Sequence, residues 1–167
     1  NTMTNAPSSA VRIKSVSHRK SVGVALFQPT IPHYRAELFN QLAERLDEPL
    51  IVYSEMPEPR SALLDGSGSL RVPMMRSRTL RVGPFWFVPM ALAVVASRRY
   101  SVVVLSWNAR QLEITPVLLL ARALGTPVVL WGHGLGHSGS PVARLFRRFQ
   151  SKLARAVIVY SHGGAEE

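Results

Sequence analysis

The chain has 167 residues, and its 20 Lys and Arg against 10 Asp and Glu give a formal net charge of +10. With 47% hydrophobic residues, it has the composition of a globular domain with a sizeable core rather than that of a disordered chain. It contains no cysteine, which excludes a disulfide scaffold, a thiol nucleophile and any Cys-ligated metal site. The basic excess favours an anionic partner, such as a nucleic acid, an acidic membrane surface or a phosphorylated substrate.

Residues 1–20 are polar and basic and lack the apolar segment of a signal peptide. We expect them to form a flexible basic leader, followed by one domain over residues 21–167. The most apolar stretch, residues 84–96, is shorter than the roughly 20 residues that cross a bilayer. The sequence therefore predicts a soluble or peripheral protein.

Short apolar runs alternate with helical patterns from residue 21 onward. Residues 22–27 are the first predicted strand. A helix follows, because Leu38, Leu42 and Leu46 recur at four-residue spacing. A second apolar strand is expected at residues 50–53.

The middle of the chain begins with a proline- and glycine-rich loop, and we expect a third strand between residues 70 and 82. Residues 85–97 are predicted to form a buried helix that Pro89 interrupts near its start. A β-branched strand at 102–105 then leads into a polar loop at 106–108.

The last third repeats the alternation. A helix is expected over residues 111–124, and a strand at 128–131 runs into a glycine-rich loop at 132–140. The next helix begins at Ser140-Pro141, and a final strand covers residues 157–160. That helix has an apolar face, consisting of Val142, Leu145, Phe146, Phe149 and Leu153, and a basic face, consisting of Arg144, Arg147, Arg148 and Lys152.

Continuously apolar strands that alternate with helices are typical of a parallel sheet with helices on both faces. We therefore predict an α/β fold with a doubly wound, mostly parallel, Rossmann-like sheet. In such sheets ligands bind beyond the carboxyl ends of the strands, where the strand order reverses. Loops expected at that edge cover residues 28–35, 106–110, 132–140 and 161–164.

The glycine-rich loop at residues 132–140 is the best local candidate for a ligand site. Its backbone amides precede a helix and can hold an anion, although a tight turn that needs positive φ angles explains the glycines equally well. Its spacing matches neither the dinucleotide-binding motif nor a P-loop. His133 is a candidate for acid–base chemistry, with a structural histidine as the alternative. No metal is predicted, because the glycines between His133 and His137 disfavour the helix that such a ligand pair requires.

Aromatic residues at 85–87 have arginines on both sides, at positions 76, 78 and 81 and at 98 and 99. This combination suits an anionic membrane surface, and a core helix with solvated ends is the alternative. Nucleic acid is not favoured as a partner, because the chain has no helix-turn-helix, RRM or KH signature.

Four blocks of the sequence resemble the N-terminal half of GT-B-fold glycosyltransferases of family 4. They occur in the family's order and spacing from about residue 21 onward, and they cover residues 28–43, 103–108, 127–134 and 156–166. The resemblance implies an acceptor-binding Rossmann-like domain of a two-domain enzyme that transfers a sugar with retention at the anomeric carbon. A nucleotide sugar would be the donor substrate, without a further cofactor or a metal.

By the same resemblance, His133 matches a position near the transferred sugar and is the candidate catalytic residue. The candidate substrate-binding residues are Gln28, His33, Tyr34, Arg35, Asn108, Gly132, Gly134 and Ser161.

The family's C-terminal donor-binding half has no counterpart in these residues, so we expect it in cis or in trans and expect the isolated chain to be inactive. From the basic and aromatic features we expect a lipid-linked or cell-envelope glycan as acceptor and a cytoplasmic location, with peripheral attachment to the inner face of the cytoplasmic membrane. The alternative is a non-catalytic Rossmann-like module that binds an anionic ligand or a membrane surface.

Overall fold

The computed structural model describes residues 21–55, 66–132 and 141–159. Its central element is a six-stranded sheet in the order β3-β2-β1-β6-β7-β8, in which all neighbouring strands are parallel. The strands are β1 (Val24–Phe27), β2 (Leu50–Ser54), β3 (Met74–Arg76), β6 (Val102–Trp107), β7 (Val128–Gly132) and β8 (Ala156–Val159). The predicted doubly wound, parallel α/β fold is therefore confirmed.

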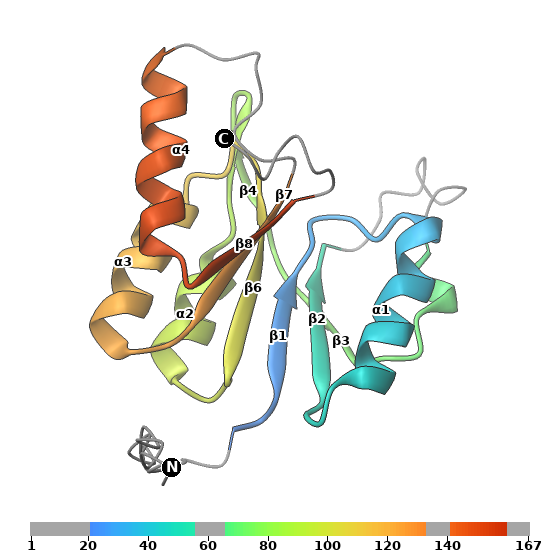
Figure 1. Ribbon diagram of the computed structural model, residues 1–167. Helices are drawn as coiled ribbons and strands as arrows, with labels where there is room; N and C mark the ends of the chain where they lie inside the picture. Colours follow the sequence, from blue (N-terminus) through green and yellow to red (C-terminus); the bar gives the residue numbers. More distant parts are fainter. Residues whose placement is uncertain (1–20, 56–65, 133–140, 160–167) are drawn as a thin grey trace, which may run out of the picture.

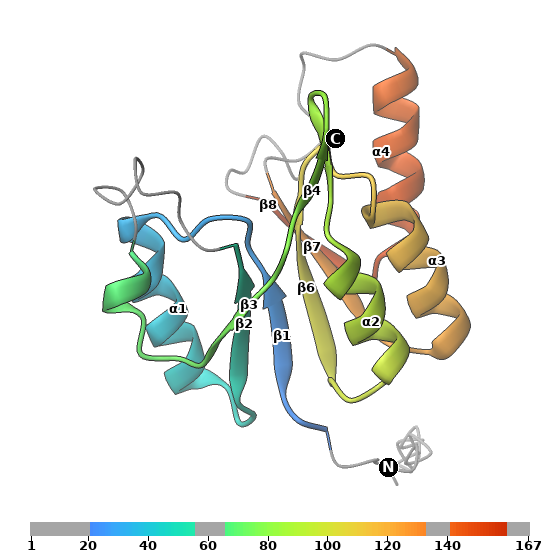
Figure 2. The ribbon, with the colours of Figure 1, turned by 180° about the vertical axis from the view of Figure 1, so that it is seen from behind.

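Helices cover both faces of the sheet (Figures 1 and 2). One face carries α1 (His33–Arg45) with the short 3-10 turn η2 (Ser67–Ser69), and the other carries α2 (Pro89–Ser97), α3 (Ile114–Leu124) and α4 (Pro141–Leu153). The chain leaves β1 toward α1 and leaves the adjacent strand β6 toward α3. The strand order therefore reverses between β1 and β6.

Each face of the sheet has its own hydrophobic core, and β1 contributes to both. Leu26 packs with Phe39 on the α1 side. Ala25 and Phe27 point to the opposite side, where they join Leu118 of α3 in the larger core. Because both faces are covered, successive side chains of the inner strands are buried or half-buried, which explains their continuous apolar runs.

The segment predicted as a helix over residues 85–97 is divided between a strand and a helix. Residues Phe85–Phe87 form β5, which pairs antiparallel with β4 (Leu80–Val82) in a separate hairpin. Gly83 takes the positive φ of 57° in the turn, and the aromatic residues that follow favour a strand. The helix α2 begins only at Pro89, because a proline at the first turn of a helix removes no internal hydrogen bond.

Two other predicted elements are present. The third strand expected between residues 70 and 82 is β3, which lies at the end of the sheet, and the same range also contains β4 of the hairpin. The helix expected from residue 111 begins at Ile114. The intervening segment turns across the carboxyl edge of the sheet, where the side chains of Gln111 and Glu113 are buried.

The apolar face of α4 is largely exposed, although an apolar face at helical spacing ordinarily packs on the core. Leu145 is 70% exposed, Phe146 49% and Phe149 46%. The first turns of α4 extend beyond the carboxyl edge of the sheet, so the strands do not cover them (Figure 1). A buried polar residue, Gln150, anchors the helix instead by accepting a hydrogen bond from Trp107 Nε1 at 2.8 Å.

Gly23 precedes β1 and packs closely against the backbone before β2. Its φ is +130°, and a Cβ there would overlap the carbonyl oxygen of Pro49. We expect Gly23→Ala to lower the free energy of unfolding by at least about 2 kcal/mol in urea denaturation. Gly68→Ala is the control, because a Cβ at Gly68 meets nothing within 4 Å. Equal losses in the two variants would contradict this account.

Candidate functional site

A cavity of about 310 Å³ lies where the strand order reverses, beyond the carboxyl ends of β1 and β6. The loops after these two strands lead to helices on opposite faces of the sheet, so they diverge and leave a crevice between them. We call it the outer cavity. It is lined by Gln28, Pro29, Thr30, Arg35, Trp86, Ser106, Trp107, Asn108, Gln111, Trp131 and Gly132.

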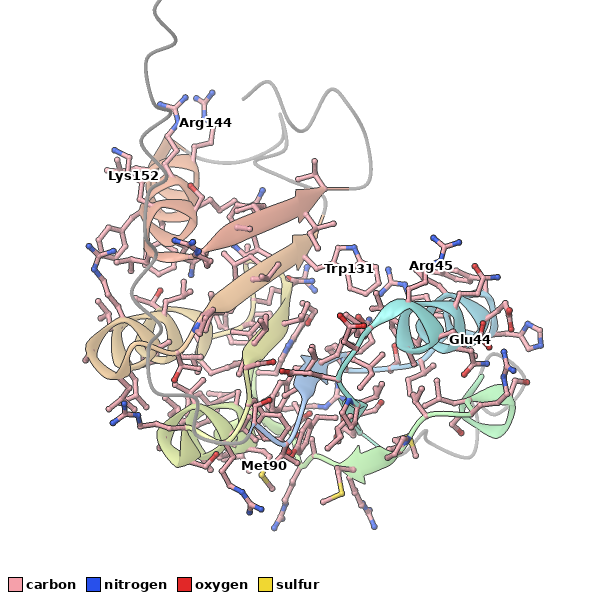
Figure 3. The ribbon with its side chains drawn as sticks, turned by 60° about the horizontal axis from the view of Figure 1, so that its bottom comes forward. Glu44, Arg45, Met90, Trp131, Arg144 and Lys152 are labelled. Carbon is pink, nitrogen blue, oxygen red and sulfur yellow. The ribbon has the colours of Figure 1, made fainter. Side chains whose placement is uncertain are left out.

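All three tryptophans of the chain line the outer cavity, although they come from β5, β6 and β7. Trp107 is held by its hydrogen bond to Gln150. The ring of Trp131 lies between the end of β7 and α1 (Figure 3), edge-on to Phe39 at 5.7 Å and 5.3 Å from the guanidinium carbon of Arg35. The cavity therefore combines aromatic walls with a cation.

A chain of hydrogen-bonded polar side chains forms the floor of the outer cavity. Ser106 Oγ donates to Gln111 Oε1 at 3.2 Å, and Gln111 Nε2 donates to Glu113 Oε1 at 3.0 Å. Gln111 is 6% exposed and Glu113 2%. The oxygen and the nitrogen of the Gln111 amide each have a hydrogen-bond partner. Glu113 therefore fixes the orientation of this amide, and the amide in turn orients the Ser106 hydroxyl.

A second, much smaller inner cavity adjoins this floor. It leaves about 10 Å³ for the centre of a water-sized sphere, which is room for one water molecule. Gln28, Ser106 and Gln111 line both cavities. Gln28 Oε1, Ser77 Oγ and Glu113 Oε2 are buried without a hydrogen-bond partner among the described residues, and all three residues line the inner cavity. Each such group costs about 1–3 kcal/mol if it stays unpaired, so the cavity suits a small hydrogen-bonding guest.

Burial raises the pKa of Glu113 above its ordinary value of 4.5. Backbone hydrogen bonds and the hydrogen bond from Gln111 lower the pKa by less than burial raises it. A buried carboxyl group with a raised pKa, located at the ligand-binding edge of a sheet, is a candidate functional group.

Four of the predicted binding residues meet in the outer cavity, namely Gln28, Arg35, Asn108 and Gly132. Gln28 follows β1, and its backbone amide donates to the Tyr53 carbonyl at 2.9 Å. Asn108 Oδ1 accepts a hydrogen bond at 3.0 Å from the backbone amide two residues later, which shapes its loop. Gly132 is required sterically, because a Cβ there would lie 2.7 Å from the carbonyl oxygen of the facing residue on β6.

His33 and Tyr34 occupy the first turn of α1 and are both exposed, Tyr34 to 72%. Neither lines the outer cavity, in contrast to Arg35, whose guanidinium carbon lies 5.6 Å from the Tyr34 ring centre. Their role in binding stays a prediction. The predicted site residues His133, Gly134 and Ser161 lie outside the described residues.

Sequence reasoning missed the tryptophans and the pair formed by Gln111 and Glu113. The position of Trp107 and Trp131 at the ends of two predicted strands was an available signal, because parallel strands end at the ligand-binding edge. For Glu113 the local sequence indicated an exposed residue rather than a buried one. An acidic residue just before an apolar helix is ordinarily a solvated group at the positive end of the helix dipole.

Within the described residues, no three His, Cys, Asp or Glu side chains gather closely enough to hold a metal ion. The candidate pair His133 and His137 lies outside those residues. No described helix combines the length and the apolar character needed to cross a membrane.

No protein-family model matches the chain, and no curated protein is significantly similar to it in sequence. Its fold is similar to that of phenylacrylic acid decarboxylase from Aquifex aeolicus, with 14% identity and a TM-score of 0.48 over 84% of this chain and 80% of that one.

Two further solved structures are similar at the same level. MurG from Acinetobacter baumannii has 17% identity and a TM-score of 0.45 over 81% of this chain, which spans 39% of the MurG chain. A protein of unknown function from Vibrio parahaemolyticus has 9% identity and a TM-score of 0.48 over 88% of this chain and 98% of that one. These similarities concern the arrangement of strands and helices and do not indicate a reaction.

Glu113→Gln tests whether burial raises the pKa of the Glu113 carboxyl group. The raised pKa means that the folded state holds the proton of Glu113 more tightly than the unfolded chain does. Protonated Glu113 therefore contributes stability that is fully present below its ordinary pKa. This contribution is lost as the pH rises through the pKa of Glu113 in the folded state. Urea unfolding from about pH 4 to about pH 8 should therefore show a larger loss of stability in the wild type than in the Glu113→Gln variant.

Glu44→Gln is the matched control, because the Glu44 side chain is 60% exposed. It should keep the pH dependence of the wild type. If the Glu113→Gln variant also keeps the pH dependence of the wild type, burial of Glu113 does not control the protonation of this carboxyl group.

Proposed function

We propose that the chain is the acceptor-binding half of a nucleotide-sugar-dependent glycosyltransferase that acts with retention on a lipid-linked or cell-envelope glycan. The observation that carries this proposal is the outer cavity, in which three indole rings stand beside amide side chains. A sugar has apolar C–H faces and a rim of hydroxyl groups, so aromatic walls with a few placed polar groups suit it. The resemblance of four sequence blocks to family 4 glycosyltransferases supports the same assignment.

In the proposed reaction, the acceptor hydroxyl oxygen bonds to the anomeric carbon of the donor sugar while the bond from that carbon to the phosphate oxygen breaks. The acceptor hydroxyl passes its proton to the phosphate oxygen that departs, and the nucleoside diphosphate leaves. Gln28 and Asn108 orient the acceptor, and Arg35 faces the phosphates, since a guanidinium pairs well with phosphate oxygens. His133 contacts the transferred sugar. These residues contribute by positioning and charge stabilisation, and a donor-binding half in cis or in trans completes the site.

The test is a transfer assay with the protein expressed from its whole open reading frame, together with any separately encoded donor half. Labelled nucleotide sugars are supplied with membranes from the organism that encodes it. Asn108→Ala should lower kcat/KM about tenfold or more, which corresponds to the loss of about one good hydrogen bond to the acceptor. Glu44→Gln should leave it unchanged. If no nucleotide sugar yields a glycosylated product, the proposal is wrong.

We also propose that α4 attaches this half to an anionic membrane surface. The support is the exposure of Leu145 and Phe149 beside the exposed cations Arg144, Arg148 and Lys152, on a helix without any acidic residue. Arg144 and Lys152 point away from the sheet (Figure 3). Apolar side chains that insert among lipids next to cations that meet the head groups are typical of helices that lie on a membrane.

Vesicle sedimentation tests this attachment. Leu145→Ser with Phe149→Ser should weaken binding to phosphatidylglycerol vesicles about tenfold or more, because two apolar anchors are lost. Leu119→Ser on α3 is the control, because Leu119 is also exposed, to 49%, and lies outside the proposed surface. Equal binding to neutral phosphatidylcholine vesicles would contradict the role of the cations.

The exposed helix also favours a second candidate function, a non-catalytic module that binds a membrane or another anionic ligand. Such a module needs α4 but not the outer cavity. It therefore predicts that the Leu145→Ser and Phe149→Ser pair abolishes function, while Asn108→Ala has no effect on it.

A further inference from the structure

We propose that the inner cavity receives one hydroxyl group of the sugar held in the outer cavity, and that Gln28, Ser77 and Glu113 hydrogen-bond to it. The choice of a sugar as the ligand rests on the proposed function. The subsite itself is inferred from the geometry of these three residues.

Three segments far apart in the sequence supply the unpaired polar atoms of the inner cavity. Gln28 follows β1, Ser77 follows β3 and Glu113 precedes α3, and these residues are 7%, 3% and 2% exposed. Each has a buried side-chain oxygen without a hydrogen-bond partner among the described residues. The inner cavity shares Gln28, Ser106 and Gln111 with the outer cavity, so a ligand in the outer cavity lies against the same side chains.

The unpaired atoms match a hydroxyl group better than the other small groups of a ligand. Gln28 Oε1 can only accept a hydrogen bond, the Ser77 hydroxyl can donate or accept, and Glu113 Oε2 accepts when ionised or donates when protonated. A hydroxyl has one hydrogen and two lone pairs, so it satisfies all three atoms when Glu113 is protonated: it donates to Gln28 Oε1 and accepts from the Ser77 hydroxyl and from Glu113 Oε2. An ammonium group only donates, so it leaves the proton of that carboxyl group without an acceptor, and a methyl group leaves all three atoms unpaired.

The subsite should make the cavity selective for one hydroxyl position of a sugar. The inner cavity has room for one water molecule, whose two hydrogens and two lone pairs match the three unpaired atoms. A ligand hydroxyl can replace that water and its hydrogen bonds, whereas a deoxy analogue displaces it without replacing them. A site built to hydrogen-bond a hydroxyl rejects the analogue that lacks it, because its buried partners are left unpaired.

Fluorescence of the intrinsic tryptophans measures this selectivity directly, since all three line the outer cavity. The chain is titrated with methyl glucoside, galactoside and mannoside and with their monodeoxy analogues. We expect at least one parent glycoside to bind, and its analogue at one ring position to bind about tenfold more weakly, which corresponds to about one hydrogen bond. Analogues at the other positions should bind like the parent.

Two variants assign that selectivity to the inner cavity. Gln28→Leu removes the acceptor for the hydrogen of the ligand hydroxyl, Ser77→Ala removes one donor to its oxygen, and neither variant changes the charge. Both should reduce the discrimination against the deoxy analogue to less than about threefold. Glu44→Gln should retain the full discrimination.

The proposal is overturned if the Gln28→Leu and Ser77→Ala variants discriminate as the wild type does, or if none of the glycosides binds. It is also overturned if the amino sugar at the selected position binds more tightly than the hydroxyl form, since that indicates an ammonium subsite. Selective binding without any transfer in the assay of the whole protein would overturn the proposed function and leave the hydroxyl subsite in place.

Discussion

The pairing of β1 with β2 on one side and with β6 on the other organises the whole molecule. Both pairings are parallel and extend over the full length of β1. Because each parallel connection must cross a face of the sheet, the chain leaves β1 toward one face and β6 toward the other. The two cores, the division of the helices and the crevice between β1 and β6 all follow from this arrangement.

Buried polar side chains gather at the carboxyl edge of the sheet, whereas the strands themselves are mostly apolar. Gln28, Gln111 and Glu113 are nearly as buried as the core, yet they lie just beyond strands that are apolar on both faces. Burying polar groups in this way opposes folding, and the apolar packing of the two cores must offset it. A cost of this kind, located beside the outer cavity, is typical of a functional site.

Helix α1 illustrates how far a periodic pattern predicts packing. The leucine stripe identifies the helix, but Leu38 is 47% exposed, and the fully buried large side chain is the adjacent Phe39. Asn40 is also buried, because its amide donates to the Ser69 carbonyl at 3.0 Å and accepts from the Arg71 backbone amide at 2.7 Å. These partners lie about thirty residues away in the sequence, so no local pattern predicts the burial of Asn40.

The sequence by itself determined the strands of the parallel sheet, most of the helices, the parallel α/β class and the loops that carry Gln28 and Asn108, because these depend on residues within a few positions of one another. Only the tertiary structure decided the strand order, and with it the meeting of Gln28, Trp86 and Trp131 in one cavity. It also decided that Glu113 is buried while Leu145 is exposed. The physical reason is that strand pairing and burial depend on contacts between distant segments, which hydrophobic periodicity does not record.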